Sequence, residues 1–198
     1  MTSPIVAKDD PWRVLVKSLS YWPSVNEQPY VALISIAEQR LYLYVSGRRK
    51  KEYLVSTSRF GVGNRDGSYK TPLGLHRVVE KIGANAPLGT IFKARRPTPR
   101  IARIYKTRIT LPYDLVTTRI LRLEGLEPGI NKGLGIDTYH RYIYIHGTHE
   151  EGMIGQPASI GCVRMRNDDV IKLFDTLPEN ALVLIVAGYP GDKWASAH

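Results

Sequence analysis

Short runs of apolar, aromatic and β-branched residues, separated by turn residues, dominate the pattern of this chain. Runs of this kind predict β-strands, because side chains of a strand point alternately to its two faces. We expect strands over 30–36, 41–45, 52–58, 75–79, 115–123, 141–145 and 181–187. Ser46-Gly47 predicts a tight turn, so the first three strands should form a β-meander.

Helical patterns are few. Asn167-Asp168-Asp169 precedes a set of apolar residues with helical spacing, so this polar run predicts a capped helix start. A short amphipathic helix is also expected before Tyr21, with Val14, Leu15, Val16 and Leu19 on its apolar side. The predicted fold class is therefore mainly β, a sandwich or barrel-like domain with a small helical component.

The chain has 198 residues, of which 43% are hydrophobic, enough for one compact core without disulfides. We expect a domain over 29–188, an N-terminal extension over 1–28 and a C-terminal tail over 189–198. Residues 83–112 are expected to form an irregular, basic insertion, either a lid over the substrate or an ordinary surface excursion.

The formal net charge is +10, which suits acidic ligands, nucleic acid or a membrane surface. Charge alone does not choose among these partners. The 12 tyrosines fit strand positions and no RNA- or DNA-binding motif is present, so we expect no nucleic-acid partner. The glycine-rich loop at 61–67 lacks the Gly-Lys-Ser/Thr ending of a phosphate-binding loop, so it is interpreted as a turn.

Candidate chemistry centres on Cys162, the only cysteine, in the string Ser-Ile-Gly-Cys-Val-Arg-Met at 159–165. A lone thiol makes no intrachain disulfide, so it either packs in a core or reacts. His146 ends a strand-like run upstream and can act as the base that takes the thiol proton and returns it to a leaving amine. The group that orients His146 is either a distant Asp or a main-chain carbonyl such as that of Gly147.

The residues beside Cys162 have predicted roles of their own. Gly161 permits a backbone that a side chain would block, so the amides of Gly161 and Cys162 could form an oxyanion hole. The helix expected to start near Asn167 would bring a positive dipole end close to Cys162 and favour its thiolate. We expect Ser159, Thr148 and Arg164 to contact substrate, although Arg164 could instead brace the catalytic loop.

His146-Gly147-Thr148, the Cys162 string and Lys70-Thr71-Pro72-Leu73-Gly74 together resemble the YkuD-type L,D-transpeptidase catalytic domain, over about 29–188. The resemblance implies that Cys162 is the nucleophile, His146 the base and the Gly147 carbonyl its orienting group. Family members act on peptidoglycan stem peptides and need no cofactor. The family commonly has histidine directly before the Gly-Cys pair, whereas this chain has Ile160.

The resemblance implies a thioester at Cys162 after release of D-alanine, which an amine resolves by transpeptidation and water by L,D-carboxypeptidase activity. Residues 1–29 contain six charged residues and no apolar stretch of export-signal or membrane length, so we expect a cytoplasmic protein without a membrane partner. A cytoplasmic enzyme would meet soluble recycled muropeptides. We therefore expect hydrolysis of tetrapeptide stems, with cross-linking as the alternative.

Two further hypotheses remain open at this point. A zinc enzyme could use His146, His149 and Cys162, although no helical pattern supports the two histidines as ligands, and we expect no metal. A wall-binding domain without catalytic activity is the other hypothesis, and an intact Cys162/His146 pair argues against it. The oligomeric state is not predicted.

Overall fold

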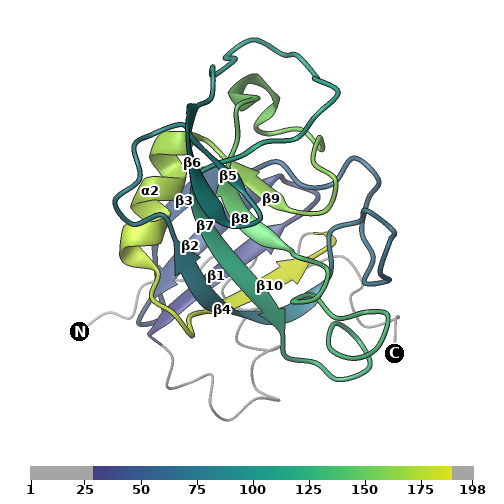
Figure 1. The fold of residues 1–198 in the computed structure, drawn as a ribbon. Coiled ribbons are helices and arrows are strands. Elements are labelled where there is room, and N and C mark those ends of the chain that lie inside the picture. Colours follow the sequence, from purple (N-terminus) through teal and green to yellow (C-terminus); the bar gives the residue numbers. More distant parts are fainter. Residues whose placement is uncertain (1–28, 189–198) are drawn as a thin grey trace, which may run out of the picture.

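The computed structural model describes residues 29–188, and these form a strongly curved, mainly β fold (Figure 1). Its sheet strands are β1 (Tyr30–Ser35), β2 (Arg40–Val45), β3 (Arg48–Leu54), β4 (Gly74–Ile82), β5 (Thr90–Lys93), β6 (Arg96–Ile101), β7 (Val116–Gly125), β8 (Tyr144–Gly147), β9 (Val163–Met165) and β10 (Leu182–Val186). The described helices are α2 (Asn167–Thr176) and the short 3-10 helix η2 (Glu151–Met153).

The main path of the sheet runs β3-β2-β1-β10-β4-β7-β5-β6. β1 and β10 pair in parallel at its centre, although they come from opposite ends of the described range. In both strands, alternate side chains enter two different cores, with Ala32 and Ile34 on one face of β1 and Val31 and Leu33 on the other. Burial of both faces explains why these strands are nearly continuous apolar runs.

The larger core lies between the sheet and α2, which stands along one flank in Figure 1. Val170, Leu173, Phe174 and Leu177 carry the apolar side of this segment into that core. The helix begins at Asn167 as expected, but Asn167 is not its cap. Arg166 occupies the N-cap position without a side-chain cap bond, and the Asn167 N–H donates to Glu151 Oε1 over 2.8 Å.

β7 is where the sheet branches. β4 and β5 pair with β7, and β8 also pairs with β7 and, on its other side, with β9 in parallel. Thr118 has a positive φ of 68° where the β7–β8 register shifts, between Thr117 and Ile120. This irregularity bends β7 between its two sets of partners. This branch contains the two candidate residues, since His146 lies on β8 and Cys162 directly precedes β9.

The predicted strands at 30–36, 41–45, 75–79, 115–123 and 181–187 are confirmed with small shifts at their ends. The strand expected at 52–58 instead covers Arg48–Leu54, because the charged run before it is an exposed strand at the sheet edge. The strand expected at 141–145 starts at Tyr144, since Tyr142 has a positive φ of 56°.

The prediction of an irregular insertion over 83–112 is wrong for its central part. β5 and β6 form a hairpin there, which adds to β7 as the outermost strands of the path. Pro97 and Pro99 are tolerated in β6 because an edge strand does not need every N–H for pairing. The segment after β6 is fixed to the loop after β8, since Tyr105 N–H donates to the His149 carbonyl over 2.8 Å.

The N-terminal helix expected before Tyr21, the extension over 1–28 and the tail over 189–198 lie outside the described residues. Among residues 29–188, no helix combines the length and apolar character needed to cross a membrane.

Candidate active site

Cys162 and His146 come together through the parallel pairing of β8 with β9. His146 lies opposite Arg164, and Cys162 directly precedes β9. Ile145 and Val163 point into the larger core, whereas Cys162 packs against the separate apolar cluster that contains Tyr144. The alternation along both strands therefore directs the thiol, the imidazole and the Arg164 side chain away from the main core.

The Cys162 thiol is held by the main chain of two tyrosines. Tyr144 N–H donates to Sγ over 3.4 Å, and the thiol lies 3.5 Å from the Tyr142 carbonyl, to which it can donate. Burial raises the pKa of the Cys162 thiol to about 12, against the opposing effect of the Tyr144 N–H. This burial opposes the expected effect of the helix dipole on the thiolate, and that effect stays a prediction. The first N–H of α2 is taken by Glu151, and burial favours the neutral thiol at Cys162.

His146 is buried and its tautomer follows from one contact. Nδ1 lies 2.7 Å from the Gly147 carbonyl, which can only accept, so Nδ1 carries the proton and Nε2 is left as the basic nitrogen. Burial lowers the pKa of His146, with Asp114 and the Gly147 carbonyl opposing it. The carbonyl predicted to orient the base therefore does so, and no side-chain acid takes that contact.

Gly147 has no space for a side chain. A Cβ there would lie 2.6 Å from Asn167 Oδ1 and 2.8 Å from the Thr117 carbonyl, and the latter is backbone that cannot move aside easily. The glycine lets β7, β8 and the start of α2 approach closely beside the imidazole.

Burial favours the neutral forms of both the Cys162 thiol and the His146 imidazole, and this bears on how the pair can react. Among the described residues no hydrogen bond joins Sγ to the imidazole, and such bonds often tighten only when substrate binds. Burial at both groups disfavours a preformed thiolate–imidazolium pair, which favours transfer of the proton to His146 Nε2 as Sγ attacks.

The loop before Cys162 is fixed by Ser159. Its hydroxyl donates to the Cys162 carbonyl over 2.6 Å and accepts from the Gly161 N–H over 3.2 Å. Gly161 has a φ of +132°, a conformation that favours glycine. The Gly161 amide is thus occupied, whereas no acceptor for the Cys162 N–H occurs within residues 29–188. Of the two predicted oxyanion donors, the Cys162 N–H is the one that is available.

Arg164 is buried and fully engaged inside the protein. Nη2 lies 2.7 Å from Asp114 Oδ2, and Nη1 lies 2.7 Å from Glu150 Oε2. Glu150 also accepts the Leu111 N–H over 2.6 Å. Arg164 therefore joins β9 to the segment before β7 and to the loop after β8, which favours the bracing role over recognition of substrate.

The other two residues expected to contact substrate are also internal. Ser159 and Thr148 are both 0% exposed. Thr148 Oγ1 accepts the Glu150 N–H over 3.1 Å, and its carbonyl accepts from Asn167 Nδ2 over 2.8 Å. We therefore assign Ser159, Thr148 and Arg164 to support of the catalytic loop and not to direct contact with substrate.

Comparison with known proteins agrees with this geometry. The family model for the L,D-transpeptidase catalytic domain, YkuD, matches residues 29–185. The chain belongs to this family.

Among curated relatives of this YkuD-family chain, the probable L,D-transpeptidase YcfS of Escherichia coli is 31% identical over 156 residues, covering 78% of this chain and 43% of the relative. The probable L,D-transpeptidase ErfK/SrfK of the same organism is 30% identical, covering 84% of this chain and 49% of the relative. The chain thus spans about half the length of these relatives.

A solved L,D-transpeptidase from Mycobacterium smegmatis has the same fold, with a TM-score of 0.50 and 14% identity over 81% of this chain and 59% of that chain. The predicted β-sandwich class with a small helical component is confirmed by this similarity and by the strands described above.

Sequence reasoning missed the residues that support the YkuD-type pair from a distance. Asp114 and Glu150 neutralise Arg164, and Asn167 links three segments. Asn167 Oδ1 accepts the Thr117 hydroxyl over 2.7 Å while its amide donates to Thr148 and Glu151. The only sequence signal was a polar residue at the helix start, which we interpreted as a cap.

The zinc hypothesis finds no site in the described part of the chain. Within residues 29–188, no three His, Cys, Asp or Glu side chains form a cluster suited to a metal ion. His149 instead stacks on Tyr113, with ring centroids 5.4 Å apart and planes at 13°. Its pKa is lowered by burial.

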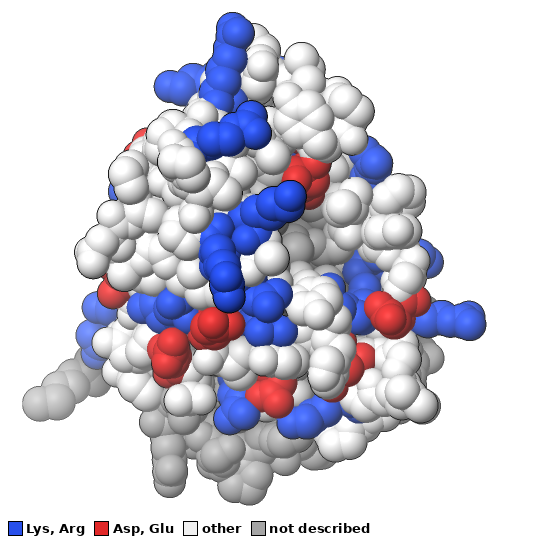
Figure 2. Space-filling model, in the orientation of Figure 1, with Lys and Arg blue, Asp and Glu red and all other residues white. Residues whose placement is uncertain are grey.

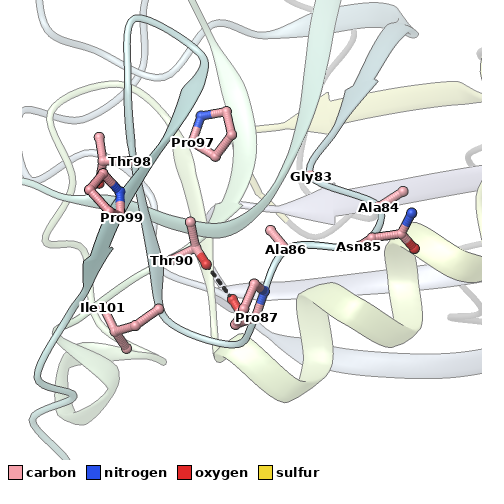
Figure 3. A pocket seen from close by; sticks show the side chains of 10 residues that line it. All are labelled: Gly83, Ala84, Asn85, Ala86, Pro87, Thr90, Pro97, Thr98, Pro99 and Ile101. Atoms are coloured by element: carbon pink, nitrogen blue, oxygen red, sulfur yellow. Dashed lines mark hydrogen bonds between the residues drawn. The ribbon is translucent and has the colours of Figure 1, made fainter.

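A cavity of about 540 Å³ lies between the loop after β4 and the β5–β6 hairpin (Figure 3). Its lining is glycine, alanine, asparagine, proline, threonine and isoleucine, and within this lining the Thr90 hydroxyl donates to the Pro87 carbonyl over 2.7 Å. No ionisable side chain and no candidate catalytic residue lines it, so it offers no acid–base chemistry.

Proposed function

We propose that this domain transfers the acyl group of a peptidoglycan stem peptide through a thioester on Cys162. The observation that carries the proposal is the placement of the thiol and of an imidazole whose Nδ1 is fixed by the Gly147 carbonyl on the same side of the paired segments β8 and β9, in a chain of the L,D-transpeptidase catalytic domain family. The names of the relatives support a substrate with an L,D-peptide bond. The family resemblance implies that this bond joins the L-centre of diaminopimelate to a terminal D-alanine.

In the first half-reaction, Cys162 Sγ attacks the carbonyl carbon of the diamino acid and its proton passes to His146 Nε2. The Cys162 N–H is the main-chain donor for the oxyanion that forms. The C–N bond then breaks, the proton on Nε2 goes to the amine of D-alanine, and the thioester remains. In the second half-reaction, His146 deprotonates the acceptor, which attacks the thioester and releases the thiol.

The acceptor decides whether the product is a cross-link or a shortened stem. The names of the relatives support an amine acceptor, which makes the domain an L,D-transpeptidase. Hydrolysis, the outcome expected from sequence, has one specific observation in its favour. Ile160, which is 43% exposed directly before Gly161, presents an apolar surface where the family commonly has an imidazole.

One assay tests both levels of the proposal. Purified protein is incubated with a tetrapeptide stem, with and without an amine acceptor, and the products are weighed by mass spectrometry. A tripeptide–acceptor adduct supports transpeptidation and free tripeptide supports hydrolysis. Release of no D-alanine under any condition, or equal release by Cys162→Ala, would refute the proposal.

Ile160→His separates the two acceptors. If this position controls acceptor choice, the variant should increase the ratio of adduct to free tripeptide. An unchanged ratio would remove the structural argument for hydrolysis. The cytoplasmic location remains a prediction, and fractionation of cells followed by immunodetection of the native protein would test it.

A further inference from the structure

Arg95 lies at the turn of the β5–β6 hairpin, far from Cys162 in sequence. Ala94 and Arg95 form this turn with positive φ values of 47° and 66°. Arg95 Nη1 donates to the Tyr144 hydroxyl over 3.2 Å, and its guanidinium carbon lies 5.3 Å from the centre of the Tyr142 ring. Two contacts of this kind fix a guanidinium without neutralising its charge.

The two tyrosines that contact Arg95 are also the two that hold the nucleophile. Tyr144 N–H donates to Cys162 Sγ, and the Tyr142 carbonyl faces the thiol. Tyr142 is 54% exposed, whereas Tyr144 is 7% exposed. The Arg95 side chain is therefore held against the two residues whose main chain contacts the Cys162 thiol.

The other guanidiniums in this region are engaged elsewhere. Arg164 binds two carboxylates, and Arg122 lies 3.5 Å from Glu80 and donates to the Tyr139 carbonyl. Arg141 donates to the carbonyls of Gly63, Asn64 and Lys70. These three arginines have their charge or their donors occupied by the protein itself.

Arg95 differs from all three. Among the described residues it forms no ion pair with a carboxylate, and residues 83–112, which contain its hairpin, include no Asp or Glu. Glu80 is the acidic side chain whose charge acts on Arg95, and it is paired with Arg122. Figure 2 shows Lys and Arg side chains over the hairpin region and the upper part of this face, while most acidic side chains in view lie lower. An anion arriving at Cys162 meets Arg95 as a positive group with free donors.

We propose that Arg95 binds a carboxylate of the substrate and aligns its scissile carbonyl with Cys162. This rests on the proposed function, since a stem peptide ending in D-alanine carries a terminal carboxylate and diaminopimelate carries a second one on its side chain. Arginine suits this task because its planar group can donate two parallel hydrogen bonds to one carboxylate. Its anchoring by the two tyrosines reduces the entropy lost on binding.

Selective alkylation of Cys162 tests the anion site without any substrate. Iodoacetate and iodoacetamide both form a carbon–sulfur bond with loss of iodide, but only iodoacetate is an anion. The single cysteine makes intact mass a direct measure of each rate. Arg95→Gln should lower the iodoacetate-to-iodoacetamide rate ratio about fivefold, and Arg95→Lys should retain part of it.

The matched control is Arg96→Gln, which removes the same charge from the neighbouring exposed position on β6. It should leave the ratio within about twofold of the wild type, since charge pairs in solvent are weak. Gln tolerates the positive φ at residue 95 no worse than Arg. An unchanged ratio in Arg95→Gln, or an equal fall in Arg96→Gln, would overturn the proposal.

Stem peptides identify the carboxylate. Arg95→Gln should raise KM for the normal tetrapeptide several-fold, with a smaller effect on kcat. If the effect disappears with D-alaninamide at the terminus, Arg95 binds the terminal carboxylate. If it disappears when lysine replaces diaminopimelate, Arg95 binds the side-chain carboxylate, and an effect that persists with both peptides refutes carboxylate binding. Wild-type protein without turnover would refute the proposed function, while the alkylation ratio would still decide the role of Arg95.

Discussion

Replacing Arg164 with Met tests whether this arginine is a brace. The Arg164 side chain is 3% exposed, and its partners Glu150 and Asp114 are 2% and 15% exposed. Met fills similar volume without the charge, so the two carboxylates would remain in the interior without a cation. Loss of one partner of a buried ion pair costs about 3–5 kcal/mol, which corresponds to a fall in Tm of roughly 6–20 °C for a chain of this size.

The control is Arg77→Met, which breaks a pair of similar length in a more exposed setting. Arg77 Nη2 lies 2.6 Å from Glu124 Oε2, with side-chain exposures of 42% and 20%. Partly exposed pairs contribute up to about 1 kcal/mol. Urea denaturation of both variants and the wild type at pH 7 measures how much each substitution lowers the free energy of unfolding. The loss should be larger for Arg164→Met because its ion pairs are more deeply buried.

Repeating the denaturation at pH 5 tests whether carboxylates left without a counter-charge cause the loss of stability. Burial without a counter-charge favours the neutral form of a carboxyl group, so the cost of Arg164→Met should shrink as the stranded groups take up protons. A cost no larger than that of Arg77→Met, or a larger cost that does not change with pH, would refute the argument that stranded carboxylates cause the loss.

Three more predictions follow from the site and the core. Cys162→Ala should abolish turnover with an unchanged Tm, and His146→Ala should lower kcat/KM by about 10²–10⁴, both measured by release of D-alanine. Gly161→Ala should cost more than about 1 kcal/mol in urea denaturation, because φ is +132° and the new Cβ would lie 3.3 Å from Ile143 Cδ1. Burial lowers the pKa of His76 to about 4 from 6.5, so stability should be complete above pH 6.5 and fall by about 3 kcal/mol towards pH 4. His76→Gln should flatten that dependence, and a wild-type curve that is already flat would contradict it.

The central strands were predictable because both of their faces are buried. β1 and β10 are almost wholly apolar, so their sequences specify strands whatever their neighbours are. The candidate catalytic pair, His146 and Cys162, could be named for a different reason, since the motif around these residues is specific to the family. The sequence also indicated two groups that could orient His146, a distant Asp or the Gly147 carbonyl, and the structure shows the contact with the carbonyl.

Edge strands were harder to predict. β3 begins with four consecutive basic residues, and β6 contains two prolines, so neither has an apolar alternation. Such residues are suited to an edge, where they prevent pairing with another chain. Their strand conformation depends on β2 and β5 as templates, and a local pattern does not contain that information.

The residues expected to bind substrate, Ser159, Thr148 and Arg164, all lie close to Cys162 or His146 in sequence. A nucleophile placed at the start of a strand needs its loop held rigidly, and the nearest side chains supply those internal bonds. Ser159 and Arg164 are accordingly buried and occupied. Side chains that contact an incoming substrate are therefore expected on other segments near Cys162, such as hairpins and loops that are remote from it in sequence. Arg95, brought to Tyr142 and Tyr144 only by the pairing of β5 with β7, is such a group.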